Sequence, residues 1–145
     1  MGCTVTMTIL SERQDGPIGD DWRYTVEAKV FNQGLTDKGK VKVKKHQLSS
    51  GVTQDPPGPP DPLVLNAGDC GEEVLVRLQV DATEVDWLIH DKGTGTMDMN
   101  IRCPGEGADP ISKDVEVSVG VRESPGLSGE TSIFRLNMRL VAECA

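Results

Sequence analysis

The stretch YTVEAKVFNQG, residues 24–34, decides the fold class, because its apolar and polar side chains alternate before a turn-forming end. The side chains of one face are Tyr24, Val26, Ala28 and Val30, and those of the other are Thr25, Glu27, Lys29 and Phe31. The stretch then ends in Asn-Gln-Gly, which is typical of a turn. Alternation with a period of two residues predicts a β-strand with one buried face.

The same alternation recurs along the chain, and no segment has helical periodicity over ten residues. It predicts strands at residues 3–10, 22–32, 40–48, 63–65, 73–80, 85–90, 96–103, 112–122 and 132–144. Turn or break signals are expected at residues 37–39, 81–83, 92–93 and 124–126. We therefore expect one domain, residues 1–145, folded as an all-β, immunoglobulin-like antiparallel β-sandwich of eight or nine strands.

The charge of the chain limits its partners. The formal net charge is −8 at pH 7, and aromatic residues make up only 3% of the 145 residues. Nucleic-acid binding needs a Lys/Arg surface, so no nucleic-acid partner is expected. No apolar run approaches the roughly 18 residues of a membrane-spanning helix, so no membrane insertion is expected. An acidic surface suits solubility, cation binding or a basic partner.

One predicted strand has a lysine on every second residue. In residues 40–48, Lys40, Lys42 and Lys44 alternate with Val41 and Val43. Outward lysines are typical of a solvated edge strand, where they discourage pairing with another chain.

The four cysteines predict disulfide bonds. No Cys-x-x-Cys pair is present, which argues against a zinc ribbon or a redox motif. Cys3 begins the first strand and Cys144 ends the last, so we expect a Cys3–Cys144 bridge and a Cys70–Cys103 bridge. The alternative is four buried thiols in a reducing compartment. Disulfides place the protein in an oxidising location, extracellular or on a cell surface, or alternatively in a virion.

The sequence contains no known catalytic motif. There is no Gly-x-Ser-x-Gly, no His-Glu-x-x-His and no phosphate-binding loop, so we expect a protein that is not an enzyme. Carboxylates concentrate in the predicted turns, where Ca²⁺ could find its oxygen ligands. Asp20, Asp21 and Asp86 are the candidate metal ligands. The alternative is a solvated acidic surface without any cofactor.

Aromatic and proline residues give the candidate contact positions. Trp22, Tyr24 and Trp87 align with apolar residues and are expected in the core rather than as sugar-binding platforms. Phe31 lies on the polar face of its strand and is a candidate interaction residue. Residues 53–62 form a Pro-rich loop, and its candidate interaction residues are Pro56, Pro57, Pro59 and Pro60. This segment is either a stiff connection or an arm that docks on a neighbouring subunit.

Three stretches in order carry a resemblance to a known family. They are VEAKVFNQG (residues 26–34), GKVKVK (39–44) and LNAGDCGEEVLVRLQV (65–80). This order resembles the immunoglobulin-like adhesion-related domains of bacterial surface proteins, called CARDB. The resemblance implies an adhesion or spacer module rather than an enzyme. The acidic, Asn-Asn-containing hairpin usual near the end of such domains is missing, and the chain is longer than one such domain.

Together these observations predict a non-catalytic structural or adhesive interaction module of a cell surface or extracellular assembly. Its partners would be proteins or further copies of itself. Two alternatives stay open. One is a structural subunit of a larger particle, such as a viral capsid cement or decoration protein or a filament subunit. The other is a calcium- or carbohydrate-binding module.

Overall fold

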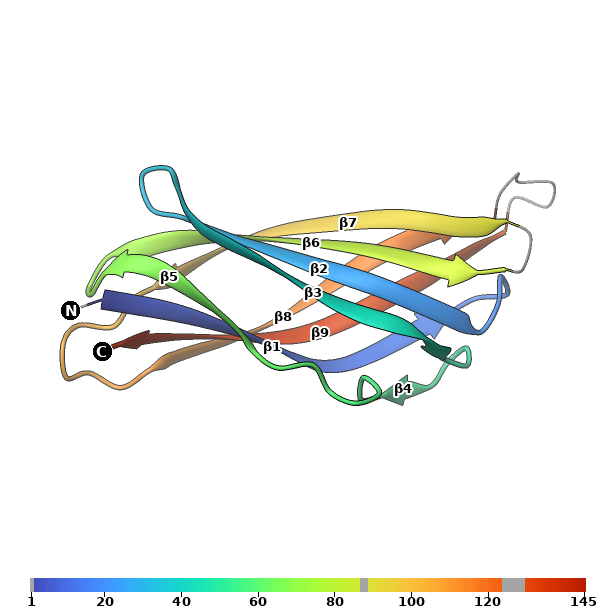
Figure 1. Cartoon of the computed structure of the whole chain (residues 1–145), viewed down its shortest axis with the longest axis horizontal. Coiled ribbons are helices and arrows are strands. Elements are labelled where there is room, and N and C mark those ends of the chain that lie inside the picture. Colours follow the sequence, from blue (N-terminus) through green and yellow to red (C-terminus); the bar gives the residue numbers. More distant parts are fainter. Residues whose placement is uncertain (1, 87–88, 124–129) are drawn as a thin grey trace.

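Residues 2–86, 89–123 and 130–145 are described by the computed structural model, and their regular elements are all β-strands (Figure 1). The strands in these ranges are β1 (Gly2–Asp15), β2 (Asp21–Phe31), β3 (Leu35–Gln47), β4 (Thr53–Gln54), β5 (Leu63–Asp69), β6 (Glu73–Val85), β7 (His90–Arg102), β8 (Ile111–Arg122) and β9 (Thr131–Cys144). The predictions that concern Trp87 and the turn at 124–126 lie outside the described residues.

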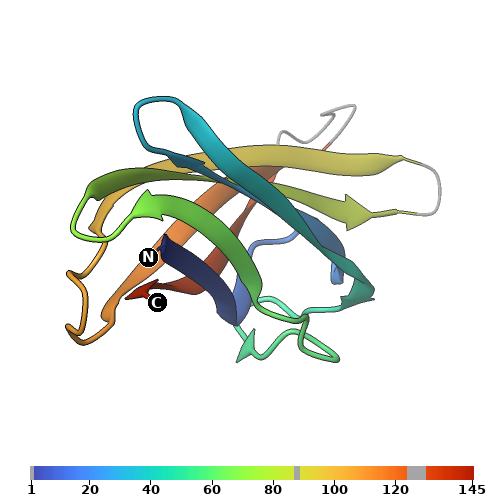
Figure 2. The same ribbon diagram turned by 60° about the vertical axis from the view of Figure 1, so that its left-hand side comes forward.

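The strands form two antiparallel sheets that face each other (Figures 1 and 2). In the first sheet, β8, β9 and β1 are successive neighbours, and β4 and β5 both pair with the remaining edge of β1. The second sheet has the order β3-β2-β6-β7. The predicted all-β sandwich is therefore confirmed, with nine strands in the described ranges.

The core lies between the sheets, on the faces that the alternation predicts. Its aromatic centre is formed by two inward residues of β2, Trp22 and Tyr24, which pack on Phe134 of β9. The ring centroid of Phe134 lies 5.6 Å from that of Trp22 and 5.0 Å from that of Tyr24. Both β2 residues are at most 1% exposed, so their prediction as core residues is confirmed and neither is a sugar-binding platform.

Several strands are longer than predicted, and three of them, β3, β6 and β7, run through residues where a turn or break was expected. Residues 81–83 do not break β6, because Ala82 faces the core, while Asp81 faces outward and accepts a hydrogen bond from the Thr94 hydroxyl at 2.5 Å. β6 therefore runs to Val85 and β7 starts at His90, where a separate strand at 85–90 was predicted. The expected turns at 37–39 and 92–93 are likewise wrong, since these residues lie inside β3 and β7.

Two β-bulges reverse which side chains face the core. In the β1–β9 ladder, the register shifts between Ile9 and Ser11, so Glu12 faces inward instead of Ser11. In the β2–β3 ladder, Lys44 and Lys45 together lie opposite Arg23. A bulge adds one residue to one strand and turns the following side chains to the other face. Such a shift leaves no simple trace in the sequence alternation.

The two sheets approach closely where β7 meets β8. A Cβ atom added to Gly93 would lie 2.3 Å from the Gly120 carbonyl oxygen, and one added to Gly95 would lie 2.5 Å from that of Ser118. Glycine has no Cβ, so it lets the two backbones approach this closely. The sandwich is therefore nearly closed along this side.

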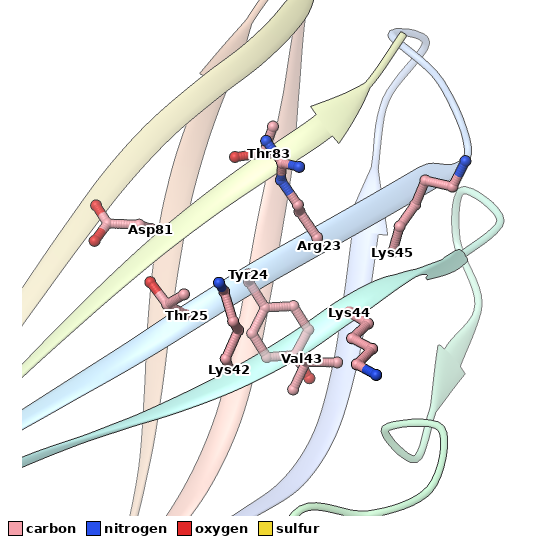
Figure 3. Close-up of a pocket in the computed structure, with 9 residues that line it drawn as sticks. All are labelled: Arg23, Tyr24, Thr25, Lys42, Val43, Lys44, Lys45, Asp81 and Thr83. Carbon is pink, nitrogen blue, oxygen red and sulfur yellow. The ribbon is translucent and has the colours of Figure 1, made fainter. Parts of the chain in front are cut away.

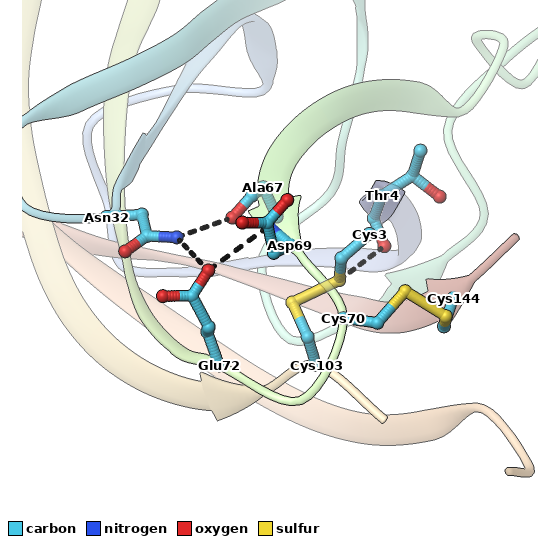
Figure 4. Close-up of a disulfide and its surroundings, with 9 residues drawn as sticks. All are labelled: Cys3, Thr4, Asn32, Ala67, Asp69, Cys70, Glu72, Cys103 and Cys144. Atoms are coloured by element: carbon cyan, nitrogen blue, oxygen red, sulfur yellow. Dashed lines mark hydrogen bonds between the residues drawn. A yellow bond between two sulfur atoms is a disulfide. The ribbon is translucent and has the colours of Figure 1, made fainter. Parts of the chain in front are cut away.

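All four cysteines form disulfides, but the predicted pairing is wrong (Figure 4). Cys3 is the ladder partner of Cys144, as expected for the first and last strands. However, Cys3 points across the sandwich and bonds to Cys103, which directly follows β7 of the facing sheet, with 6.0 Å between their Cα atoms. Cys144 instead bonds to Cys70 in the β5–β6 turn, at 5.4 Å. The sequence pattern gives the ladder neighbours but not the distance between the sheets.

Candidate functional site: a lysine-lined groove

Four cationic side chains gather along β3 and its neighbour β2 (Figure 3). Lys42, Lys44 and Lys45 come from β3, and Arg23 comes from β2. The bulge exposes Lys44 and Lys45 although they are consecutive, and their side chains point in different directions. Within residues 2–86, 89–123 and 130–145, none of the four forms an ion pair. Strand alternation predicted two of them, Lys42 and Lys44, and missed Arg23 and Lys45.

Two adjoining hollows, which we call the lysine groove, are both lined by Lys42, Lys44 and Lys45, and Arg23 lines the first of them. The first, of about 360 Å³, lies over β2 and β3 and also includes Thr25, Asp81 and Thr83. The second, of about 540 Å³, lies between β3 and the Pro-rich loop. The residues 42–45 line both hollows, so β3 forms the ridge between them.

The Pro-rich loop supplies one wall of the groove. Pro57 and Pro60 line the second hollow together with Gly58. Of the other two candidate prolines, Pro56 is buried and Pro59 is exposed, and neither lines the second hollow. A Pro-rich segment has little conformational freedom to lose, which makes it a suitable wall for a binding surface.

Phe31 lies away from this groove. It ends β2, whereas the groove adjoins the start of that strand. The guanidinium carbon of Arg77 lies 5.1 Å from the ring centroid of Phe31, and the guanidinium also donates to Asp98 at 2.8 Å. The aromatic ring is therefore half-buried under a cation, and the structure does not bring it together with the candidate prolines.

Beneath the groove lies a buried polar cluster centred on Glu12. The Tyr24 hydroxyl donates to Glu12 Oε1 at 2.7 Å, and the Gln54 amide donates to Glu12 Oε2 at 3.0 Å. His46 Nε2 also contacts Glu12 Oε2. Glu12 is fully buried, so these three partners replace the water that its carboxylate would otherwise bind. Sequence reasoning missed Glu12, because the β1 bulge that turns it inward is not visible there.

Both ring nitrogens of His46 are engaged. Nδ1 lies 2.7 Å from the Lys44 carbonyl oxygen, which can only accept, so Nδ1 carries a proton. Nε2 binds Glu12. A general base needs a free nitrogen directed at a substrate. As arranged here, the imidazole joins β3 to β1 and offers no such nitrogen to the groove.

Burial also changes the chemistry of Tyr24. Desolvation, and after it the neighbouring Glu12 carboxylate, raise the pKa of the Tyr24 phenol far above its ordinary range. The hydroxyl therefore stays protonated and donates to Glu12 over the whole physiological pH range. The floor of the groove is thus a fixed polar layer rather than a reactive one.

A second cluster of side chains lies near the β6–β7 hairpin. Asp86, one of the predicted metal ligands, lies beside Glu84 and Asp91, with ligand oxygens of all three within 4.8 Å of one another. The Asp21 backbone N–H donates to the Glu84 carboxylate. Asp20, also predicted, contributes its carbonyl oxygen to Leu48 N–H at 2.7 Å and is not in the cluster. Glu84 follows Val80 and Ala82 on the apolar face of β6. A charged residue where the alternation predicts an apolar one is the signal by which Glu84 could have been identified as a candidate ligand from the sequence.

No protein-family model matches the chain, and no curated protein matches it either. The resemblance to bacterial adhesion-related domains therefore stays a prediction. The two disulfides are typical of an oxidising, extracellular-type environment. Among the described residues, no helix is long and apolar enough to span a membrane.

Proposed function

We propose that the protein is a non-catalytic interaction module of an extracellular or cell-surface assembly, which holds an acidic, extended segment of a partner polypeptide in the lysine groove. The observation that carries this proposal is the set of four cations around the groove, Arg23, Lys42, Lys44 and Lys45, without an ion pair in the described ranges.

The charge of the groove is opposite to that of the molecule. The whole chain carries −8. The four groove cations and Asp81, which also lines the groove, contribute +4 − 1 = +3, so the other residues sum to −8 − 3 = −11. A cationic surface on an anionic body attracts an acidic partner to one place and repels it elsewhere. The sign therefore favours an acidic ligand at the groove over any other surface.

The groove also exposes backbone N–H and C=O groups at an edge of β3 that is unpaired in the part of the chain that the structure describes. In the described ranges, β3 pairs with β2 along one edge, and no strand pairs with its other edge. Near Gly39, β5 lies alongside β3: Leu63 packs against Gly39, and the Asp37 carboxylate accepts from Asn66 N–H at 2.8 Å. From Lys42 to His46, the edge faces the second hollow instead. An exposed strand edge binds extended peptides by main-chain hydrogen bonds, which favours a polypeptide over a polysaccharide. Lysines on an edge discourage pairing in general, so the strand that binds here should be one whose acidic side chains pair with them.

Fluorescence anisotropy with a labelled peptide of alternating Glu and Thr tests this proposal. We expect binding that weakens as salt is added, and a Gln-Thr peptide should bind more weakly. The K42A/K44A variant should lose about tenfold or more in affinity. The matched control is K38A/K40A, which removes the same charge from the same strand outside the groove and should bind like wild type.

Three results would overturn the proposal. One is equal weakening in the control variant. Another is binding of dextran sulfate without binding of the acidic peptide, which would assign the groove to a polysaccharide. The third is self-association in sedimentation velocity that K42A/K44A abolishes, which would make a second copy the occupant. This last result would support the particle-subunit alternative.

A further inference from the structure

The carboxylates of Glu84, Asp86 and Asp91 form a compact group of oxygens near the β6–β7 hairpin. Glu84 and Asp91 are direct ladder partners on β6 and β7 and face the interior. Ligand oxygens of the three residues lie within 4.8 Å of one another. The Ca²⁺–oxygen distance is about 2.5 Å, so oxygens on opposite sides of one ion lie about 5 Å apart. The spacing therefore fits a single ion between the three side chains.

A second observation points to a missing ligand. Glu84 is only 2% exposed, and its Oε1 has no hydrogen-bond partner among the described residues. A buried carboxylate oxygen without a partner is costly, since it has lost water and gained nothing. The hydrogen-bond partners of the Glu84 carboxyl group are the Asp21 backbone N–H and the side chain of Asp86, which is itself acidic.

The electrostatics of the group agree with this geometry. Burial, followed by the charge and hydrogen bond of Asp86 and by the charge of Asp91, raises the pKa of Glu84 to about 8. The neighbouring charges that act on Glu84 are thus both negative. A cation placed between the three groups would relieve this repulsion.

We propose that Glu84, Asp86 and Asp91 form a binding site for a divalent, oxygen-preferring cation of the Ca²⁺ class. Carboxylate oxygens are hard ligands, and three carboxylates supply three to six of the six to eight oxygens that Ca²⁺ takes, with water completing the shell. Zinc prefers nitrogen and sulfur, and the group contains neither. The site thus uses Asp86 of the predicted ligands, replaces Asp20 and Asp21 as side-chain ligands, and adds Glu84 and Asp91.

The β1–β2 turn shields one side of the site. A Cβ added to Gly19 would lie 2.5 Å from the Glu84 carboxyl carbon, so this turn packs directly on the carboxylate. The site lies at the end of the sandwich opposite the chain termini (Figure 1). Bound Ca²⁺ would therefore join β6, β7 and this turn at the end that the disulfides do not reach.

Calorimetric titration with Ca²⁺ and melting curves with EDTA or millimolar Ca²⁺ test the site. An ion that binds only the folded state must raise the melting temperature. We expect wild type to bind about one Ca²⁺ and to melt several degrees higher with Ca²⁺. E84Q keeps the shape but removes a charge, so it should fold and lose both responses. The matched control, E106Q, changes an exposed turn residue and should respond like wild type.

Any of three results would overturn the site. The first is a wild-type protein with no calorimetric signal and the same melting temperature in EDTA and Ca²⁺. The second is a Ca²⁺ response that survives in E84Q and in D86N. The third is tighter binding of Zn²⁺ than of Ca²⁺. Should E84Q fail to fold, D86N alone decides between these outcomes.

Discussion

Glu12 of β1 and His46 of β3 bind each other across the interior, although their strands belong to opposite sheets. Each reaches this position because of a bulge in its own strand. The shift between Ile9 and Ser11 turns Glu12 inward, and the extra residue at Lys44–Lys45 turns His46 inward. The same β3 bulge exposes Lys44 and Lys45. It therefore places both the lysines that line the groove and the His46 side chain beneath it.

The Glu12 cluster should contribute strongly to stability. Removing one partner of a buried, hydrogen-bonded pair leaves the other uncompensated, so E12Q should lower the free energy of unfolding by about 3 kcal/mol. Y24F leaves Glu12 without one donor and should cost about 1–2 kcal/mol. Urea unfolding of the single and double variants measures both losses and their coupling.

In that cycle, the double variant should lose less than the sum of the singles, because the two side chains share one hydrogen bond. E27Q is the control, since Glu27 forms an ion pair with Lys29 at 3.6 Å on the surface. It should change stability by less than about 0.5 kcal/mol. If the losses of E12Q and Y24F were strictly additive, the hydrogen bond between Tyr24 and Glu12 would make no contribution to stability.

Alkaline unfolding should report on Tyr24. The pKa of Tyr24 is raised in the folded state, whereas an unfolded tyrosine ionises near pH 10. Above pH 10 the unfolded state therefore binds fewer protons than the folded state, and stability falls as the pH rises. Because the chain has one tyrosine, ultraviolet absorbance of tyrosinate reports this residue alone. Ionisation should coincide with the loss of the circular dichroism signal, and tyrosinate near pH 10 in a protein that is still folded would contradict the buried hydrogen bond.

The disulfide pairing can be read directly. Peptide mapping without reduction should recover Cys3 joined to Cys103 and Cys70 joined to Cys144. The first bridge spans 100 residues of sequence, so C3A/C103A should lose about 4–5 kcal/mol in the chain-entropy account. A Cys3–Cys144 peptide would restore the pairing predicted from the sequence and contradict the structure.

The close approach of β7 and β8 predicts a contrast between two glycines. G95A places a methyl group 2.5 Å from the Ser118 carbonyl oxygen, so it should cost about 1–3 kcal/mol through displacement of the backbone. G120A is the control, because its added Cβ meets nothing within 4 Å, and it should be neutral or slightly stabilising. Thermal melts of both variants decide the matter, and equal melting temperatures would argue against a tight contact.

The sequence predicts much of the fold because alternation records which face of each strand is buried. Trp22, Tyr24 and the valines of β8 lie where their periodicity places them. It fails where a polar residue faces outward within a long strand, as Asp81 does, since polarity there resembles a turn. The prediction from alternation also fails at the bulges. A register shift there reverses which side chains face the core, and no particular residue type in the sequence indicates where such a shift occurs.

The candidate sites could be predicted only in part, for the same reason. Lys42 and Lys44 follow the alternation, but Lys45 is exposed through the bulge, and Arg23 joins them only through the β2–β3 register. Asp86 was predicted from its place in an acidic turn. Glu84 and Asp91 lie beside Asp86 because they are ladder partners in the β6–β7 hairpin. The sequence pattern predicts a separate strand at residues 85–90 instead of this hairpin, so it does not bring the two residues together.

The glycine contact between β7 and β8 also bears on how copies of this chain can grow into assemblies. Each of these strands ends its own sheet, and the close approach of their backbones leaves little room for an incoming strand between them. At β3, by contrast, an added strand would pair with the edge of that strand that is unpaired among the described residues. Pairing of β3 with β3 of a second copy would use up both of these edges and close as a dimer, whereas an added strand of another polypeptide would present its own outer edge.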